Sequence, residues 1–272
     1  MAHDPRKLCR RYLTLAKRWW AAVLLCKACL IVFSAVIISF SVFSKFAPFV
    51  ALAVTLSSEF CQARSDKAKS IGELLLRKLD YLDAFGWQIS KAELSDVFVD
   101  AGAKMRKRTP AKNDDEKYFA SKDPIGTQRA LENIQESAWW TKHLAHKMFC
   151  YLLAGTVTTM VLAIVLLIVT VGTVSDFQVL AGVGRVVMAV VMLIVSLGLV
   201  RLTNSYYQAN QMSQHAESRA TELMSHSTNQ VEVIKLYSEY HLNRATAPLI
   251  PNRMWKWNRE TLNELWNEYR AA

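Results

Sequence analysis

Apolar residues form long, nearly unbroken runs in two regions of this chain. Residues 149–174 contain no charged side chain, and residues 177–200 contain only Arg185. Ser175 and Asp176 separate the two runs. A helix needs about 20 mostly apolar residues to cross the hydrocarbon core of a bilayer. The pattern therefore predicts two membrane-spanning helices joined as a hairpin by a very short turn.

A second hydrophobic region lies near the N-terminus. Residues 21–44 carry a single charge, and a shorter run at 46–58 follows Lys45. The shorter run reaches a spanning length only when it is extended to 46–63. We interpret this region as a second hairpin. Two alternatives stay open: 46–63 could be re-entrant, or 21–63 could form one bent anchor.

The distribution of charge orients these hairpins. The chain carries 33 Lys and Arg against 23 Asp and Glu, which gives a net charge of +10. Six basic residues lie in 1–20, sixteen in 64–148 and eight in 201–272, whereas the two turns contain only Lys45. Basic residues that flank spans stay on the cytoplasmic side, where they face anionic lipid. We therefore expect both termini and the middle segment to be cytoplasmic.

Paired tryptophans lie close to these basic flanks. Trp19 and Trp20 directly follow two basic residues at the start of the first hydrophobic run. This arrangement is typical of an aromatic belt at the membrane surface. We assign Trp139 and Trp140, which precede the third run, the same role of interfacial anchor.

Outside the hydrophobic runs, apolar positions spaced three and four residues apart predict helices. One such helix covers 65–85. Ser90 and Glu93 form a capping box for a shorter helix, which Gly102 closes. Residues 104–116 are polar and charged, which predicts a loop or linker.

The second half of the chain gives three further helical segments. A helix begins near Gln128 and runs into the third hydrophobic run. Residues 203–243 lack Gly and Pro and predict one long helix. Pro248 and Pro251 end it, and a final amphipathic helix follows.

Together these segments predict an all-α membrane protein with two transmembrane hairpins, four spans in total. We expect the basic N-terminal helix and first hairpin at 1–64, a small helical cytoplasmic module at 65–148, the second hairpin at 149–202 and C-terminal helices at 203–272. The 52% hydrophobic content excludes a disordered chain, and 9 Gly with 6 Pro exclude a collagen-like one. Five cysteines are too few for a secreted disulfide scaffold.

Ionisable and hydroxylated residues within the spans are candidates for a pore or gate. Glu59 is expected near the inner boundary of its span and Arg185 near the outer end. Each could line a vestibule or simply lie at an interface. Thr156, Thr159 and Thr170 make one side of the third span less apolar. They could line a water-filled path or favour close helix packing.

A cluster of basic residues in the middle segment is a candidate anion site. Its members are Lys104, Arg106, Lys107 and Arg108. Together they could hold phosphates or an anionic head group. The alternative is a solvated juxtamembrane loop.

No motif in the chain indicates an enzyme or a cofactor. Phosphate-binding, dinucleotide-binding, metalloprotease, hydrolase and kinase signatures are absent from the sequence. Cys26 and Cys29 have C-x-x-C spacing but lie in a span, where they serve as small packing residues. His143, His146 and Cys150 share a helical face without a fourth ligand, so we predict no metal site.

Four stretches resemble a group of bacterial membrane effectors. They are the basic helix around Arg10–Arg18 that enters the first span, Pro48 in the second span, the stretch Asn133–Leu144 before the third, and the tail from Ile250 to Glu264. In this architecture the chain is similar to the SMODS-associated four-transmembrane pore-forming effectors. The two-transmembrane SLATT proteins are the nearest alternative.

The resemblance implies an anti-phage effector in the bacterial inner membrane. In such a system a sensor enzyme makes a cyclic nucleotide, and the effector responds by assembling or opening, so that the membrane loses its potential. It also implies a homo-oligomer whose partners are the lipid bilayer and a cyclic nucleotide or a cytoplasmic sensor protein, and not duplex nucleic acid. The alternative hypothesis is a non-conducting membrane scaffold or sensor that recruits a cytoplasmic partner through its helical module.

Overall fold

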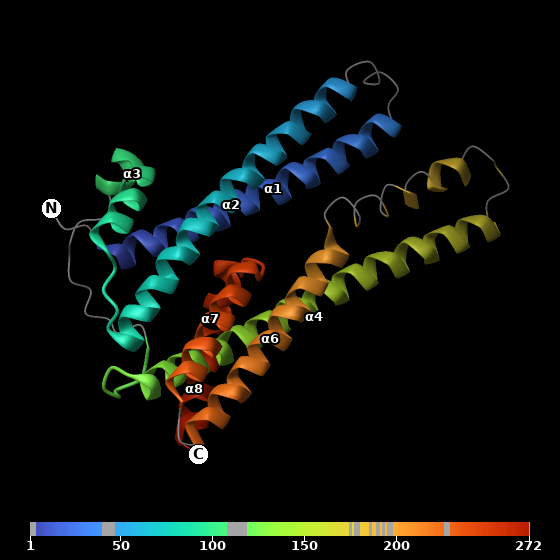
Figure 1. The fold of residues 1–272 in the computed structure, drawn as a ribbon. Helices are drawn as coiled ribbons and strands as arrows, with labels where there is room; N and C mark the ends of the chain where they lie inside the picture. Colours follow the sequence, from blue (N-terminus) through green and yellow to red (C-terminus); the bar gives the residue numbers. More distant parts are fainter. Residues whose placement is uncertain are drawn as a thin grey trace. The chain divides into compact units, whose positions relative to one another are not determined.

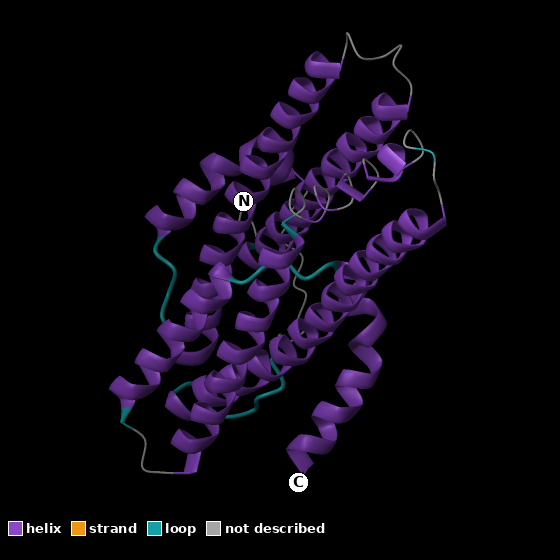
Figure 2. Cartoon of the chain, turned by 90° about the vertical axis from the view of Figure 1, so that its right-hand side faces the viewer, coloured by secondary structure: helices purple, strands orange, loops and turns teal. Residues whose placement is uncertain are grey.

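The structure, a computed structural model, describes residues 4–39, 47–107, 119–173, 198–225 and 229–271, with a few positions between 176 and 194 (Figure 1). Every regular element within these ranges is a helix, which confirms the all-α part of the predicted fold (Figure 2). The helices are α1 (Pro5–Ser39), α2 (Ala47–Phe85), α3 (Lys91–Lys107), α4 (Thr127–Thr173), α6 (Leu199–Ser225), α7 (Gln230–Thr246) and α8 (Asn252–Ala271).

The chain forms two compact units, each built from segments that are distant in sequence. Unit 1 contains Met1–Lys17, Asp66–His146 and Tyr207–Ala272. Unit 2 contains Arg18–Ser65 and Lys147–Tyr206. The helices α1, α2, α4 and α6 each contribute to both units.

The larger core of unit 1 lies where α2, α4, α6 and α7 meet. Small side chains, among them Ala84, Ala130 and Ala220, let the helices approach closely. Larger ones fill the space between the helices, and Leu131 and Tyr237 are almost completely enclosed. This core holds α7 against α2, and it thereby positions the polar side chains that these two helices share.

A second core in unit 1 joins the start of α1 to α2 and α3. Leu8, Tyr12 and Leu75 are buried there. Gly72 allows the closest approach, since a Cβ built at this position would lie 2.8 Å from Leu13 Cδ2. The Cys9 thiol donates a hydrogen bond of 3.4 Å to the Gly72 carbonyl across the same contact.

The start of α3 confirms a sequence prediction, whereas its end corrects one. The backbone N–H of Glu93 donates to the Ser90 hydroxyl at 3.2 Å, as the capping box predicts. However, α3 does not close at Gly102 but continues to Lys107. A single glycine inside a helix costs only about 1 kcal/mol, which the flanking Ala, Lys and Met residues can offset.

The prediction of one long helix at 203–243 is wrong. The chain instead forms α6 and then α7, with Asn229 as the N-cap of the second helix. The Asn229 side chain accepts a hydrogen bond of 3.0 Å from the Val231 N–H. Serine, threonine and asparagine compete with the helical backbone for hydrogen bonds, and the stretch from Ser225 to Asn229 is rich in them. The absence of Gly and Pro is therefore not enough to predict one continuous helix.

Unit 2 carries the most apolar helical segment. Within the described residues, α4 is the one helix whose length and composition would let it cross a membrane, and only 6% of its most apolar stretch is buried. Its portion in unit 2, from Lys147 to Thr173, is about 40 Å long. Half of the run at 177–200 and the last five residues of the run at 21–44 lie outside the described residues, so the four-span topology stays a prediction.

Candidate functional site

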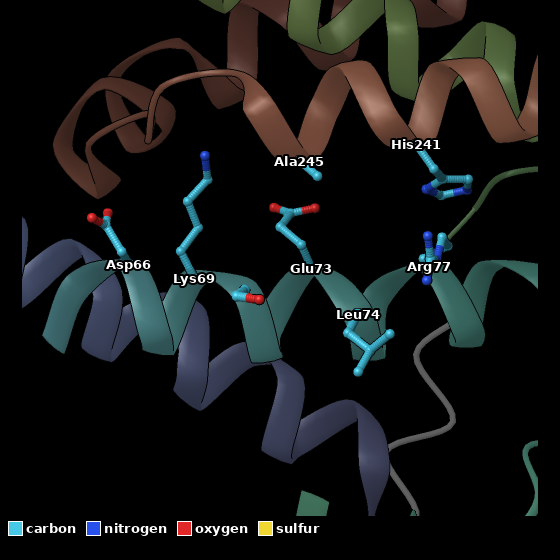
Figure 3. A pocket seen from close by; sticks show the side chains of 8 residues that line it. Asp66, Lys69, Glu73, Leu74, Arg77, His241 and Ala245 are labelled. Carbon is cyan, nitrogen blue, oxygen red and sulfur yellow. The ribbon is translucent and has the colours of Figure 1, made fainter. Parts of the chain in front are cut away.

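A polar cleft lies between α2 and α7 in unit 1, and we call it the α2–α7 cleft (Figure 3). Its volume is about 380 Å³. The lining side chains of α2 recur at intervals of three and four residues, which places them on one helical face. They are Asp66, Lys69, Ser70, Glu73, Leu74 and Arg77, and α7 contributes His241 and Ala245.

A buried ion group that includes Glu73 lies beside this cleft. The Arg244 guanidinium on α7 donates to Glu73 at 3.2 Å and to Asp80 at 3.2 Å. Burial raises the pKa of Asp80 to about 7, although Arg244 acts in the opposite direction and favours the carboxylate. One cation thus bridges two acids, and it ties the end of α7 to the C-terminal third of α2.

His241 lies next to this ion group and is neutral. Its side chain is buried, and its Nε2 is 3.8 Å from the nearer Asp80 oxygen, too far for a hydrogen bond. Burial, together with the positive charges of Arg244 and Arg77, lowers the pKa of His241 to about 2. Among the described residues its Nδ1 has no hydrogen-bond partner. In Figure 3 the ring projects from α7 towards Arg77.

Two cations line the cleft on the α2 side. Lys69 donates to the Ala247 carbonyl at 2.6 Å, and burial lowers the pKa of its ammonium group. Arg77 is half-buried and forms no ion pair with any residue that the structure describes. A half-buried guanidinium without a carboxylate partner can bind an anionic group without first breaking an ion pair.

Arg77 also borders a second cleft of about 370 Å³, which we call the Trp87 cleft. The Tyr81 and Trp87 rings stack there with centroids 5.1 Å apart and an interplanar angle of 3°. The Trp87 side chain is 48% exposed. The Tyr81 hydroxyl shares a 2.8 Å hydrogen bond with Ser238 on α7, which fixes the ring. An exposed flat ring beside a cation suits a planar, anionic ligand.

The side chains of the predicted basic cluster lie outside the part of the chain that the structure describes. Lys104, Arg106 and Lys107 lie in the last turns of α3, where the structure describes only the backbone, and Arg108 lies outside the described residues. The expected loop therefore begins later than predicted. The anion-binding role of the cluster stays a prediction.

The predicted gate residues lie in unit 2. Glu59 is exposed on α2, and Arg185 falls outside the described residues. The Thr156 hydroxyl is buried without a hydrogen-bond partner in the described chain, while that of Thr159 donates to the Gly155 carbonyl at 2.7 Å. Thr170 is buried.

The four predicted anchors separate into two groups. Trp19 packs edge-on against Phe60, with ring centroids 6.1 Å apart, and Trp20 is half-buried. Trp140 is likewise half-buried in unit 1. Trp139 differs from the prediction, because it is buried and packs against Trp266 at a centroid distance of 5.3 Å. Its role is to join α4 to α8.

The histidines before the third run do not gather ligands. The His143 ring instead packs against Trp139, with centroids 4.4 Å apart. Across the described ranges, no group of three or more His, Cys, Asp or Glu residues could hold a metal ion.

The sequence analysis missed Asp80, Arg244 and His241. One signal was available, since an acid at position 80 directly follows Leu79 of the apolar stripe, and acids are almost never buried without a partner. The partner itself lies 164 residues away in the chain.

Neither a protein-family model nor a curated protein or solved structure matches this chain.

Proposed function

We propose that this chain is a four-span protein of the bacterial inner membrane that permeabilises or depolarises that membrane when it is triggered. Unit 1 is the cytoplasmic module that receives the trigger, and unit 2 is the membrane part. The observation that carries the proposal is the inverted burial pattern of unit 2. Many of its large apolar side chains are exposed, whereas several of its hydroxyl groups are buried.

The outward-facing side chains would be costly in water. The unit 2 part of α4 alone exposes Tyr151, Leu153, Val157, Met160, Val161, Leu162, Ile164, Val165, Ile168, Val169 and Val171. Monomeric soluble proteins rarely expose apolar patches of this extent. A bilayer core of about 30 Å matches such a surface in chemistry and in length.

The enclosed side chains of unit 2 include several hydroxyls. Ser58, Ser65, Thr170 and Thr203 are buried there. Within the described residues, the hydroxyls of Ser58, Thr156 and Thr203 have no hydrogen-bond partner. Membrane helices pack through small and hydroxylated residues, and the same groups can line a hydrated path. This pattern supports a membrane assembly more than a soluble helical bundle.

The aromatic and basic residues near the boundary between the two units support the proposed orientation. Trp19 and Phe60 pack together close to both boundaries of unit 2, and the Arg64 guanidinium lies 5.3 Å from the Phe60 ring centroid. Aromatic rings gather at both surfaces of a membrane, whereas arginines gather on its cytoplasmic side. Tags inserted at Lys45 and at Asp176 should therefore be accessible from the periplasm, and protection of both tags would contradict the topology.

A conducting path requires several copies of the chain. Four helices are too few to enclose a wide pore, so protomers would have to assemble with polar faces turned inwards. The resemblance to four-transmembrane effectors also implies an assembly of several protomers. The trigger would act by binding one of two states more tightly than the other.

The clefts of unit 1 suit the kind of trigger that the resemblance implies. A cyclic nucleotide combines a flat base with phosphates. The exposed ring of Trp87 could stack on the base, and Arg77, which has no carboxylate partner among the described residues, could bind a phosphate. We therefore assign the trigger site to the α2–α7 cleft and the Trp87 cleft, on either side of Arg77.

The decisive experiment is membrane-potential dye imaging of cells that express the protein with the neighbouring genes of its operon. Activation should depolarise the inner membrane, and unchanged polarisation would contradict the proposal. Arg77→Ala should abolish the response while membrane insertion stays normal. Lys235→Ala removes an exposed cation on α7 and serves as the matched control.

Two further measurements separate the alternatives. Liposomes that contain the purified protein should leak when cyclic di- and trinucleotides are added. A scaffold would instead never leak, and changes in unit 1 would abolish capture of its partner. Glu59→Gln tests the gate: lost toxicity with normal insertion assigns Glu59 to the gate, and an unchanged phenotype assigns it to the interface.

A further inference from the structure

The first half of α8 presents two exposed tryptophans among exposed cations. Trp255 is 40% exposed and Trp257 is 66% exposed. The Arg259 guanidinium lies 5.0 Å from the Trp255 ring centroid, and that of Arg253 lies 4.4 Å from the Trp257 centroid. Both arginines and Lys256 between them are exposed, and none forms an ion pair with a described residue.

The order of charges along α8 opposes the dipole of the helix. The first turn contains no acid, and three cations precede Glu260. Cations are unfavourable near a helix N-terminus, where the dipole is positive. The helix dipole therefore does not favour these cations.

Two contacts place this part of α8 at one end of unit 1. Lys17 Nζ donates to Asn252 Oδ1 at 2.8 Å, and Lys69 Nζ donates to the Ala247 carbonyl at 2.6 Å. Lys17 is the last residue of α1 in unit 1, and Lys69 follows closely after α2 enters unit 1 at Asp66. The turn before α8 is thus held at the end of unit 1 where α1 and α2 continue into their apolar segments.

We propose that the first half of α8 binds anionic phospholipid headgroups on the cytoplasmic surface, with Trp255 and Trp257 inserted between them. This inference rests on the membrane placement proposed above. Tryptophan prefers the headgroup region, and arginine and lysine are drawn to anionic lipid. Met254, Leu262 and Trp266 are the buried residues of α8 and hold it to unit 1, so α8 would tie unit 1 to the lipid surface.

The test uses the full chain in nanodiscs that hold one copy each, made of phosphatidylcholine with or without phosphatidylglycerol. Hydrogen exchange is followed at residues 252–260. Exchange should slow by about tenfold or more when phosphatidylglycerol is present, since each cation near an anionic surface contributes about fivefold in affinity. High salt should remove most of the difference.

Variants assign the effect to these side chains. The double variant Arg253→Gln and Arg259→Gln should exchange equally fast in both kinds of disc, as should Trp255→Ala with Trp257→Ala. Arg270→Gln, which removes an exposed cation at the far end of α8, should behave like the natural protein. All of these residues are on the surface, and the folded state can be checked by the exchange of Leu262 and Trp266.

Three outcomes overturn the inference. Equal exchange in both discs with the chain inserted refutes lipid binding by α8 and leaves the four-span topology intact. Protection that appears only in discs with two copies identifies a second chain as the occupant. A chain that does not insert into discs at all refutes both the topology and this inference.

Discussion

Arg244 on α7 directs both terminal guanidinium nitrogens at the same carboxylate oxygen of Asp80 on α2, each at 3.2 Å. Glu73 accepts from the third nitrogen, Nε, also at 3.2 Å. One buried cation therefore serves two acids, so the group has an excess of negative charge whenever Asp80 is ionised. Burial of the Asp80 side chain, which is only 4% exposed, is the main reason that its pKa is raised to about 7, and the charges of Glu73 and Asp83 act in the same direction.

Loss of Arg244 should be the most damaging single change in unit 1. Arg244→Ala leaves Glu73 and Asp80 buried without a cation, and removal of one partner from a buried pair typically costs about 3–5 kcal/mol. Thermal unfolding of the purified full chain should show a large fall in the midpoint at pH 8. Arg253→Ala, which removes an exposed arginine, is the matched control and should leave the midpoint almost unchanged. Equal midpoints for Arg244→Ala and the natural protein would show that the ion group contributes nothing.

Stability should increase as the pH falls from 8 towards 6.5. The pKa of Asp80 is about 7 in the folded state and near 3.8 in an unfolded chain, so the folded protein takes up a proton that the unfolded chain does not. Proton uptake by the folded state alone raises the free energy of unfolding. Asp80→Asn should flatten this part of the profile, which a series of unfolding midpoints across the range can measure.

His241 should oppose that increase below pH 6.5. Its pKa is about 2 in the folded state and near 6.5 when unfolded, so here the unfolded chain alone takes up a proton as the pH falls. The free energy of unfolding contributed by His241 therefore decreases, and the natural profile should level off. In His241→Gln the increase from Asp80 should continue towards pH 5. If the stability of His241→Gln also levels off below pH 6.5, the protonation of His241 in the unfolded chain is not the cause.

Gly72→Ala should destabilise the crossing of α1 and α2. The new Cβ would lie 2.8 Å from Leu13 Cδ2 and 3.3 Å from the Leu13 backbone nitrogen, so the Leu13 side chain would have to move and its backbone would have to shift by a few tenths of an ångström. Overpacking of this kind typically costs about 1–3 kcal/mol. Gly155→Ala is the control, because nothing lies within 4 Å of the added atom and helical Gly to Ala is otherwise favourable. Unfolding midpoints that rank the two variants in the opposite order would contradict the close contact.

Local chemistry explains which parts of the fold could be predicted. The capping box at Ser90 depends on neighbouring residues, and it is present in the structure. The break before Asn229 also has a local signal in its polar residues, and this signal outweighs the absence of Gly and Pro from 203–243. The helical content followed from apolar periodicity, which is a property of short windows.

The candidate site could not be predicted in the same way. Arg244 and Asp80 are far apart in the chain, and no periodicity in either segment indicates which acid a distant arginine will meet. Arg77 resembles any surface arginine in the sequence, and only the packing of α7 against α2 places it between two clefts. Chemistry that arises from tertiary contacts requires the tertiary structure.

The uninterrupted course of α2 has a mechanical consequence. Glu73 and Arg77 belong to the same helix as the hydrophobic residues that follow Ala47, and Gly72, the glycine between them, packs closely against Leu13. Under the topology proposed above, a ligand that turned the unit 1 part of α2 would also turn its unit 2 part, because both parts belong to one helix. Signal relay in this protein would then need no diffusing intermediary, only the stiffness of a single helix.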